Sequence, residues 1–390
     1  MRRIWRLTLG GENGYPRSME MQMGYEVFAE LDERDHEQVV FCNDKESGLK
    51  AIIGIHNTTL GPALGGCRMY PYASERDALI DVLRLSRGMT YKAGIAGLNL
   101  GGGKAVIIGD PKSDKSEMLW RAMGRFIAGL NGRYITAEDS GTTMADMEMM
   151  RMETNWVVGI SRALGGSGDP SPVTALGVFS AMRAAVEKKL ETSSFEGLTV
   201  ALQGVGHVGY HLVGHLVEAG AKVVVADVDV DAVRKVIADY RVEAVAPEEI
   251  HAQPCDIFAP CAMGGGLNEK TIPELQCTVV AGAANNQLRE EAADGARLVE
   301  RGILYTPDFV VNAGGLINVA NELEGYNQER ALNQARGVYD ILKRVFQLSA
   351  DEGIPTYEAA NRLAMARIES LGRIRRTFTG AQAPAKVRWG

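Results

Sequence analysis

Two lysines, twelve residues apart, are the side chains of this sequence best suited to chemistry. Lys92 ends the segment Met-Thr-Tyr-Lys, and Lys104 follows three glycines directly before the apolar run Ala105–Ile108. Glycine runs suit places where the backbone turns sharply or lies against a ligand. Burial at such a place and the nearby charge of Lys92 both favour a neutral Lys104, which lowers its pKa toward the working range of a general base. We therefore interpret Lys104 as a candidate base.

Two other interpretations apply to the same residues. A surface lysine beside a tight turn would explain a single Gly-Lys pair. A phosphate-binding P-loop would need glycine six residues before the lysine and Ser or Thr after it, and these positions hold Leu98 and Ala105. The spacing therefore excludes the P-loop.

A pair of carboxylates, Glu138 and Asp139, ends the predicted strand Arg133–Ala137. Most such pairs are turn or helix-cap residues. Beside two lysines, however, one carboxylate is a suitable partner for proton transfer.

A dinucleotide-binding turn follows the predicted strand Leu198–Gln203. The glycines of a GxGxxG motif permit a tight turn, close approach of a pyrophosphate and helix–strand packing, while the helix N-terminus supplies amide donors. Asp227 ends the next predicted strand, where a carboxylate accepts both ribose hydroxyls of NAD and repels the 2′-phosphate of NADP. The turn and the start of its helix comprise Gly204, Val205, Gly206, His207, Val208, Gly209 and Tyr210.

The sequence favours no metal site. His207, His211 and His215 are spaced along one predicted helix face, but no Asp, Glu or Cys completes a ligand set nearby. The five cysteines are odd in number and form no CxxC pair, which is typical of reduced thiols in a cytoplasmic protein.

Composition narrows the class of protein further. The 390 residues include 42 basic and 49 acidic side chains, a net charge of −7 that argues against an extended nucleic-acid surface. No apolar run approaches the roughly 18 residues of a membrane span, and the N-terminus lacks a signal-peptide core. We expect no nucleic-acid partner and no membrane association.

The pattern along the chain predicts an α/β protein. In the first half it predicts strands at Gln38–Cys42 and Leu49–His56, a glycine-rich loop at Gly61–Arg68 and a helix over Ser74–Arg87 capped by Ser74. From Leu198 strands alternate with helices, which predicts a parallel sheet with helices on both faces. The breaker-rich segment 159–172 is a candidate hinge.

Six motifs together resemble the glutamate/leucine/phenylalanine/valine dehydrogenases, most closely the leucine branch. They are Ala63-Leu-Gly-Gly-Cys-Arg68, Met89-Thr-Tyr-Lys92, Gly101-Gly-Gly-Lys104, Thr136-Ala-Glu-Asp-Ser-Gly-Thr142, Asp169-Pro-Ser-Pro-Val-Thr174 and Asn312-Ala-Gly-Gly315. The resemblance spans about residues 24–371. It implies reversible oxidative deamination of an L-amino acid with NAD, and an active-site cleft between an N-terminal α/β substrate-binding and oligomerisation domain and a Rossmann domain.

The resemblance also assigns roles to residues. Lys92 would hold the substrate carboxylate, Lys104 would activate water, and Asp139 would move protons to and from the substrate nitrogen. The backbone at Gly65 and Gly66 would approach the substrate. The cofactor would be held, beyond the dinucleotide turn and Asp227, by Thr174, Cys261, Ala262, Asn285 and Asn312.

Substrate choice, by the same resemblance, lies in an aliphatic pocket formed by Leu64, Ala137, Leu316 and Val319. The pocket has no cation for a side-chain carboxylate, which disfavours glutamate and favours leucine, valine and isoleucine. Leu316 stands where many leucine-type members have Val and also occurs in phenylalanine-type members, and Ser140 replaces a commonly apolar residue. Phenylalanine or tryptophan therefore remains an alternative substrate, and a non-catalytic NAD-binding protein is a second alternative.

The expected domain boundaries follow from these motifs. We expect residues 1–18 to form a flexible extension, 19–158 with a C-terminal helix at about 356–390 to form the substrate-binding domain, and 159–355 to form the NAD-binding domain. The resemblance implies a homo-oligomer, commonly an octamer.

Overall fold

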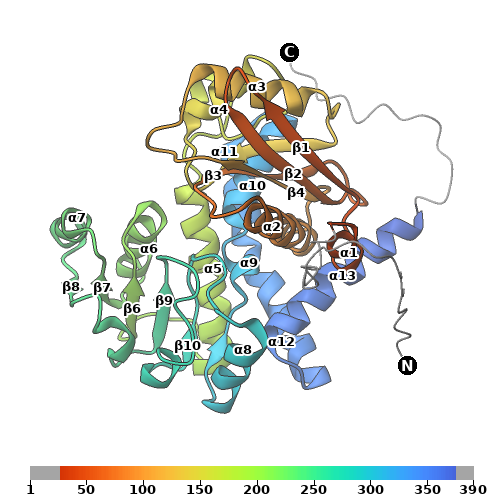
Figure 1. Ribbon diagram of the computed structural model, residues 1–390. Coiled ribbons are helices and arrows are strands. Elements are labelled where there is room, and N and C mark those ends of the chain that lie inside the picture. Colours follow the sequence, from red (N-terminus) through yellow and green to blue (C-terminus); the bar gives the residue numbers. More distant parts are fainter. Residues whose placement is uncertain (1–26, 375–390) are drawn as a thin grey trace, which may run out of the picture.

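Two β-sheets, one in each half of the chain, organise the protein (Figure 1). The computed structural model describes residues 27–374, so the predicted extension 1–18 and the last residues of the predicted C-terminal helix lie outside the described range. Within residues 27–374 no helix is both long and apolar enough to cross a membrane. The two-domain α/β fold expected from the sequence is confirmed.

The first sheet is mixed, with strand order β1-β2-β4-β3-β5. β1 pairs with β2, and β2 with β4, in antiparallel fashion, whereas β3 runs parallel to both β4 and β5. In the parallel part, Cys67 pairs with Ala105 and Gly66 with Ala137. The strands are β1 (Gln38–Asp44), β2 (Leu49–Asn57), β3 (Ala63–Tyr70), β4 (Gly101–Ile108) and β5 (Tyr134–Glu138).

The prediction of a loop at Gly61–Arg68 is wrong, because most of this segment is the buried strand β3. Glycine is rare in strands, which made the segment look irregular. In β3 the glycines have no side chain, which leaves room for residues of the neighbouring strands. A Cβ atom on Gly65 would lie 1.8 Å from the carbonyl oxygen of Gly103, and one on Gly66 would lie 2.7 Å from Cβ of Asp139.

Helix α2 (Glu75–Ile95) covers one face of the first sheet and is longer than predicted, so that it carries Lys92 near its end. The predicted cap is confirmed, since the Ser74 hydroxyl accepts a hydrogen bond from the Asp77 amide at 3.1 Å. The glycines before Lys104 belong to β4 and make no sharp turn. They let α2 approach the strand, because a Cβ atom on Gly102 would lie 2.1 Å from the Thr90 nitrogen.

The opposite face of the first sheet is covered by helices α3 (Glu117–Ala128) and α4 (Met144–Arg151). Successive residues of β2 point to opposite faces, as the period of a strand requires. Ile53 packs in the core with Trp120 of α3, while Ile52 packs with Leu79 of α2. The sheet therefore separates α2 from α3.

The second sheet is parallel throughout, as predicted, with strand order β11-β10-β9-β6-β7-β8. The chain builds outward from β6 to β8, then returns to place β9 on the other side of β6. This creates a topological switch point between β6 and β9, the place where such sheets bind ligands. The strands are β6 (Thr199–Gln203), β7 (Lys222–Ala226), β8 (Glu243–Ala244), β9 (Ile257–Pro260), β10 (Val279–Val280) and β11 (Leu304–Tyr305).

Helices cover both faces of this sheet unequally. Val200 and Leu202 of β6 pack in the large core with helices α5, α6 and α12, whereas Ala201 faces a smaller core closed by α8 and short 3₁₀ turns. The helices of this half and the remaining short ones are α1 (Val27–Glu33), α5 (Ser171–Leu190), α6 (His207–Glu218), α7 (Val230–Tyr240), α8 (Glu291–Glu300), α9 (Asp308–Val311), α10 (Gly314–Ala320), α11 (Gln328–Arg336), α12 (Val338–Glu352) and α13 (Thr356–Ile374).

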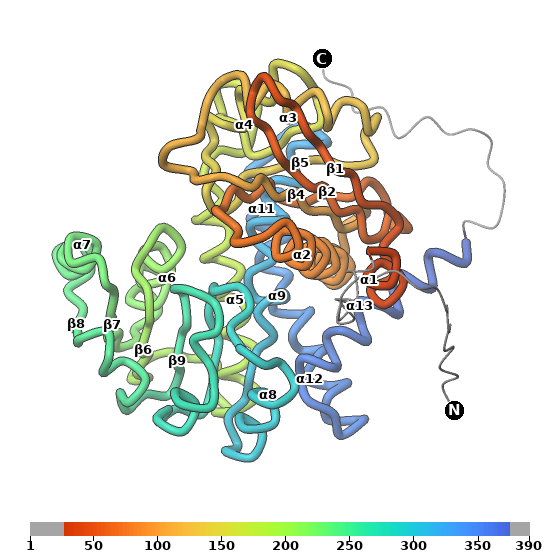
Figure 2. Tube along the Cα trace, in the orientation of Figure 1, coloured from red at the N-terminus to blue at the C-terminus, as the bar shows by residue number. Residues whose placement is uncertain are grey.

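The two halves are joined by the segment 159–172 and by the C-terminal helix. The buried Glu322 carboxylate accepts hydrogen bonds from the amides of Gly159 at 3.0 Å and Ser167 at 2.7 Å, which holds the joining segment in place. Helix α13 returns to the first half and packs beside α2 (Figure 2). There Arg367 donates to the Leu98 carbonyl at 2.7 Å.

We expect Gly102→Ala to destabilise the N-terminal half, because the new Cβ atom would overlap the backbone of α2. The free energy of unfolding should fall by at least about 2 kcal/mol, measured by urea denaturation at constant protomer concentration. Gly88→Ala is the matched control, since it lies on α2 with no heavy atom within 4 Å of a new Cβ. An equal effect at both positions would contradict the close approach of helix and strand.

Candidate active site

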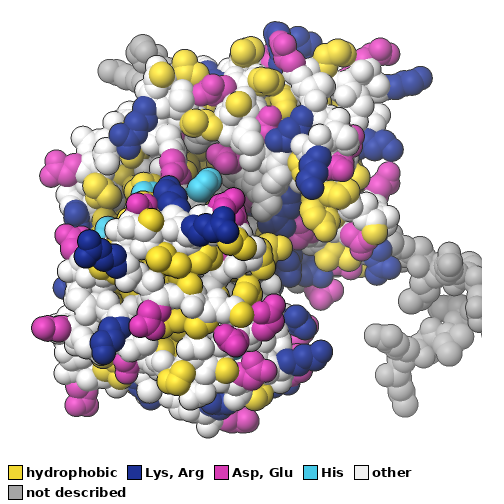
Figure 3. All heavy atoms as spheres, turned by 90° about the vertical axis from the view of Figure 1, so that its left-hand side faces the viewer, with side chains coloured by type: hydrophobic (Ala, Val, Ile, Leu, Met, Phe, Trp, Pro, Cys, Tyr) yellow, Lys and Arg dark blue, Asp and Glu magenta, His cyan; other side chains and the backbone are white. Residues whose placement is uncertain are grey.

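A cavity of about 260 Å³ lies between the two halves of the molecule. Figure 3 shows the side of the protein that lies on the left in Figure 1, and its surface is hollowed between an upper and a lower part. The cavity is lined from one side by the first sheet and α2, and from the other by the starts of α5 and α6, the segment after β10, and α10. Twelve predicted site residues line it, namely Leu64, Gly66, Lys92, Lys104, Ala137, Asp139, Thr174, Val208, Asn285, Asn312, Leu316 and Val319.

The buried Lys104 forms an ion pair with Asp139 in this cavity. Lys104 is only 4% exposed, and its Nζ donates a hydrogen bond to Oδ2 of Asp139. The other carboxylate oxygen accepts from Nε of Arg68 at 3.0 Å. Burial acts to raise the pKa of Asp139, but the charges of Lys104 and Arg68 outweigh it and bring the pKa down to about 2. Asp139 is therefore ionised at neutral pH.

The two lysines differ from the sequence-based expectation in one respect. We expected burial and a second cation to act on Lys104, but the structure gives Lys104 a carboxylate partner. At Lys92, burial lowers the pKa to about 8; the charge of Lys104 adds to this shift and the carboxylate of Asp308 opposes it. A substrate carboxylate at Lys92 would supply the counter-charge that favours the ammonium form.

Asn285 connects the two sides of the cleft. Its Oδ1 accepts a hydrogen bond from Nζ of Lys92 at 3.1 Å and from Nδ2 of Asn312 at 2.8 Å. We predicted Asn285 for the cofactor alone, and the structure also brings it to the lysine predicted to hold the substrate. A carboxylate bound at Lys92 would lie beside this amide.

The dinucleotide turn has the geometry that its glycines predict. Gly204 has φ +98°, a conformation that favours glycine. A Cβ atom on Gly209 would lie 2.0 Å from the Gly204 oxygen, whereas one on Gly206 would have no heavy atom within 4 Å. Gly209 therefore packs tightly against Gly204 within the turn, whereas there is open space beside Gly206. Asp227 lies over the turn and accepts from the Val205 amide at 2.7 Å.

These residues fit a nicotinamide dinucleotide. Helix α6 begins at His207 with Gly206 as its N-cap and has no side-chain cap, so its first amides are available to phosphate oxygens. Within the described part of the chain, Oδ1 of the buried Asn312 has no hydrogen-bond donor. An amide group such as that of nicotinamide would supply one.

Besides Asp227 and most of the dinucleotide turn, four predicted residues lie outside the cavity lining, namely Gly65, Tyr210, Cys261 and Ala262. Gly65 packs against β4, and its carbonyl accepts from the Tyr134 hydroxyl at 2.7 Å. Tyr210 is turned toward α7, where its hydroxyl donates to Asp239 at 2.7 Å. Cys261 follows β9; its thiol accepts from the Ala283 amide at 3.4 Å, and burial raises its pKa to about 12. Ala262, next along the chain, lies against Gly204 of the dinucleotide turn.

The aliphatic wall of the cavity is a single buried cluster. Leu64, Ala137, Leu316 and Val319, which come from β3, β5 and α10, pack together with other apolar side chains. Ser140, the other position noted from the sequence, is exposed and does not line the cavity.

The cavity lining also includes residues to which the sequence assigned no site role, namely Met89, Glu138, Gly159, Gly168, Pro170, Ala283 and Gly315. Met89, Glu138, Pro170 and Gly315 stand inside motifs already quoted, so the motifs contained a signal for them. The sequence also missed the contact of Arg68 with Asp139, although Arg68 ends a quoted motif.

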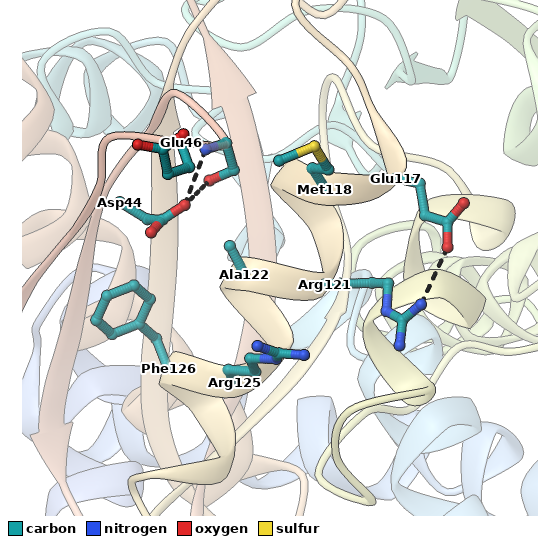
Figure 4. A pocket seen from close by; sticks show the side chains of 9 residues that line it. Asp44, Glu46, Glu117, Met118, Arg121, Ala122, Arg125 and Phe126 are labelled. Atoms are coloured by element: carbon teal, nitrogen blue, oxygen red, sulfur yellow. Dashed lines mark hydrogen bonds and ion pairs between the residues drawn. The ribbon is translucent and has the colours of Figure 1, made fainter.

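Another hollow, of about 770 Å³, lies against α3 and the turn between β1 and β2 (Figure 4). It is on the face of the sheet opposite α2, away from the lysines. Its charged side chains pair largely with each other or with neighbours, as Glu117 does with Arg121 and Asp44 with the Ser47 amide. We do not assign it chemistry.

Within residues 27–374 no group of three or more His, Cys, Asp or Glu side chains is arranged to hold a metal ion. Of the three helix histidines, His215 stacks on Phe179 at 5.6 Å and His211 contacts the ring of Tyr210.

A dinucleotide turn at a sheet switch point, facing a lysine–aspartate pair across a cleft, defines the class of two-domain nicotinamide-dependent dehydrogenases. Family models agree with this class. Residues 36–156 match the Glu/Leu/Phe/Val dehydrogenase dimerisation domain, and residues 165–233 and 226–375 match the glutamate/leucine/phenylalanine/valine dehydrogenase domain.

Individual relatives agree with the family models. The chain is 56% identical over 356 residues to a leucine dehydrogenase of Bacillus cereus, covering 91% of this chain and 97% of that one. It is 50% identical to a phenylalanine dehydrogenase of Thermoactinomyces intermedius, covering 90% and 96%. The crystal structure of L-tryptophan dehydrogenase from Nostoc punctiforme superposes with a TM-score of 0.79 at 47% identity, covering 89% of this chain and 99% of that chain. The protein belongs to the glutamate/leucine/phenylalanine/valine dehydrogenase family and is an amino acid dehydrogenase.

We expect binding of a 2-oxo acid to weaken as the pH rises above about 8, because Lys92 then loses its proton. Titration calorimetry with 4-methyl-2-oxopentanoate and NADH, without ammonium, would measure the affinity in a complex that does not react. Lys92→Arg keeps its charge over this range, so its affinity should be lower but should not fall above pH 8. The same pH dependence in both proteins would assign it to another group.

Proposed function

We propose that the protein catalyses the NAD-dependent, reversible oxidative deamination of branched aliphatic L-amino acids to 2-oxo acids and ammonium. The observation that carries this proposal is the buried aliphatic wall formed by Leu64, Ala137, Leu316 and Val319. The cations among the residues lining the cavity are Lys92 and Lys104, and the chemistry uses both. A substrate with a charged side chain would therefore leave that charge buried and unpaired, which costs several kcal/mol.

The residues of the cleft divide the chemistry among them. NAD, which the dinucleotide turn with Thr174 and Asn312 would hold, would supply the acceptor for the hydride on the α-carbon of the amino acid. Lys92 holds the substrate carboxylate as an ammonium ion, with the Asn285 amide beside it. Asp139 takes a proton from the substrate nitrogen, and Lys104 takes a proton from the water molecule that attacks the imine carbon. Asp139 then returns its proton to the nitrogen, so that the C–N bond breaks, ammonia leaves and the carbon keeps the oxygen of the water as the 2-oxo group. Closure of the cleft excludes other water.

The ion pair of Lys104 and Asp139 supports these roles. Lys104 must lose a proton before it can act as a base, and the hydrogen-bonded carboxylate gives that proton a direct path. Because Nζ of Lys104 and Oδ2 of Asp139 are hydrogen-bonded directly, a proton can pass between them without rearrangement of either side chain.

Asp227 supports NAD as the cofactor in preference to NADP. Asp227 directly follows β7, and its carboxylate accepts a hydrogen bond from the Val205 amide of the dinucleotide turn. A carboxylate there accepts the ribose hydroxyls and repels a 2′-phosphate.

Aromatic amino acids form the second candidate substrate class. The phenylalanine and tryptophan dehydrogenases in this family are 48–50% identical to the chain, and Leu316 lies in the wall of the cavity. One methylene in such a wall changes preference by only about 1–3 kcal/mol, so leucine, valine and isoleucine should all react.

The setting of the enzyme follows from the same features. The match of residues 36–156 to a dimerisation domain supports a homo-oligomer. All five cysteines are free, which fits the reducing cytoplasm.

Purified protein should produce NADH, measured at 340 nm, with L-Leu, L-Val and L-Ile faster than with L-Phe, L-Trp or L-Glu. Activity with NADP in place of NAD should be at least about tenfold lower, because Asp227 repels the added phosphate. Preference for L-Phe or L-Trp would keep the chemistry and overturn the assignment of the substrate.

Lys104→Ala should abolish turnover, since no other lysine contacts Asp139 in the described part of the chain. Loss of general base catalysis alone costs roughly 10²–10⁴-fold in kcat. NADH binding, followed by its fluorescence, should be nearly unchanged because Lys104 is not part of the dinucleotide turn. Near-normal turnover would refute the role of Lys104 as the base.

A further inference from the structure

Arg68 bridges two carboxylates without lining the cavity. It lies on β3, and its Nε donates to Oδ1 of Asp139 at 3.0 Å while Nη1 donates to Oδ2 of Asp81 at 2.9 Å. Asp139 follows β5 and Asp81 lies on α2, so the guanidinium joins three elements around the site. The roles assigned above do not account for this contact.

The far end of the bridge is itself held in place. Asp81 accepts a hydrogen bond from the Tyr72 hydroxyl at 2.6 Å and lies 3.6 Å from Nη2 of Arg84. The side chains of Arg68, Asp81 and Asp139 are 24%, 16% and 20% exposed. Partial burial keeps these charges from being screened as surface pairs are.

We propose that Arg68 is a positioning residue for the reaction: it holds one oxygen of Asp139 so that the other stays on Lys104, and its charge sets the pH at which this pair works. The inference rests on the roles proposed for Lys104 and Asp139. With Oδ1 bound to Arg68 and Oδ2 bound to Lys104, rotation of the carboxylate would break both contacts.

The contact suits arginine in particular. Nε and Nη1 of one planar guanidinium point in different directions and reach both carboxylates at once. A lysine ammonium at this place supplies the charge but is a single point on a flexible stem. Lysine can therefore replace the charge of Arg68 but not the geometry.

Other charged and titratable groups also act on Asp139. The cations near Asp139 are Lys104, Lys92 and Arg68, and the neighbouring anion is Glu138. The thiol of Cys67 and the phenol of Tyr134 also lie nearby, and burial raises the pKa of both. Loss of the Arg68 cation makes protonation of the Lys104–Asp139 pair easier. Because the reaction needs this pair to release a proton, the acid limb of the pH profile must move to higher pH.

The test compares Arg68→Met and Arg68→Lys over the pH range of activity. For Arg68→Met we expect the acid limb of kcat/KM to move up by about one pH unit and kcat to fall at least about tenfold, with KM for NAD within twofold of wild type. Arg68→Lys should return the limb to within about 0.3 pH unit of wild type but leave kcat reduced. Arg84→Gln is the matched control, since Arg84 contacts Asp81 but not Asp139, and should match wild type.

Asp81→Asn gives a second readout of opposite sign. It removes an anion beside Arg68, so the acid limb should move slightly to lower pH. Asp81→Asn also provides the test if circular dichroism shows that Arg68→Met does not fold. In that case an unchanged kcat in Arg68→Lys, together with an unchanged pH profile in Asp81→Asn, would overturn the proposal. A folded Arg68→Met with the wild-type pH profile would overturn it directly.

Lys104→Ala separates this inference from the proposed function. Turnover by Lys104→Ala would refute the proposed base, and the role of Arg68 would fall with it. An inactive Lys104→Ala together with a normal Arg68→Met would refute only the positioning role.

Discussion

The ion pair between the buried Lys104 and Asp139 is the interaction on which the rest of the site depends. A charge in the interior is tolerated only with a partner, and removing one member of such a pair costs roughly 3–5 kcal/mol. The pair requires β3, β4 and the end of β5 to lie very close together. Gly65 and Gly66 make this possible, because side chains there would overlap the backbone of Gly103 on β4 and the side chain of Asp139 after β5. The glycines in this half of the chain therefore allow its strands and helices to lie close together.

A second constraint is that the site is shared between the two halves of the chain. Lys92 comes from α2, and the Asn285 amide that contacts it follows β10 in the second sheet. Glu322 holds the backbone that joins the two halves, and α13, which follows the second sheet in the chain, returns to pack beside α2. A ligand at Lys92 would therefore lie beside a contact that joins the two halves.

Sequence motifs predicted which residues lie together better than they predicted the local backbone. The parallel sheet, the glycine turn before α6 and the cap at Ser74 were confirmed, and the residues predicted around Lys104 lie together in one cavity. The glycine-rich segment of β3 was wrongly predicted as a loop, because local preference for glycine favours irregular structure while strand pairing favoured a strand here. Helix α2 ran past its predicted end for a similar reason, since its last turns are stabilised by packing on β4.

The sequence by itself determined the class of fold, the glycine turn before α6 and the lysines and carboxylates proposed for the site, because these depend on residue types at short, regular spacings. Only the tertiary structure decided how they meet. It gave Lys104 a carboxylate partner, brought Lys92 to Asn285, and placed Arg68 on Asp139, 71 residues away in the chain. Such contacts depend on the register of strands and on the angle at which helices cross them. Both are set by packing over the whole domain, which no short segment of sequence contains.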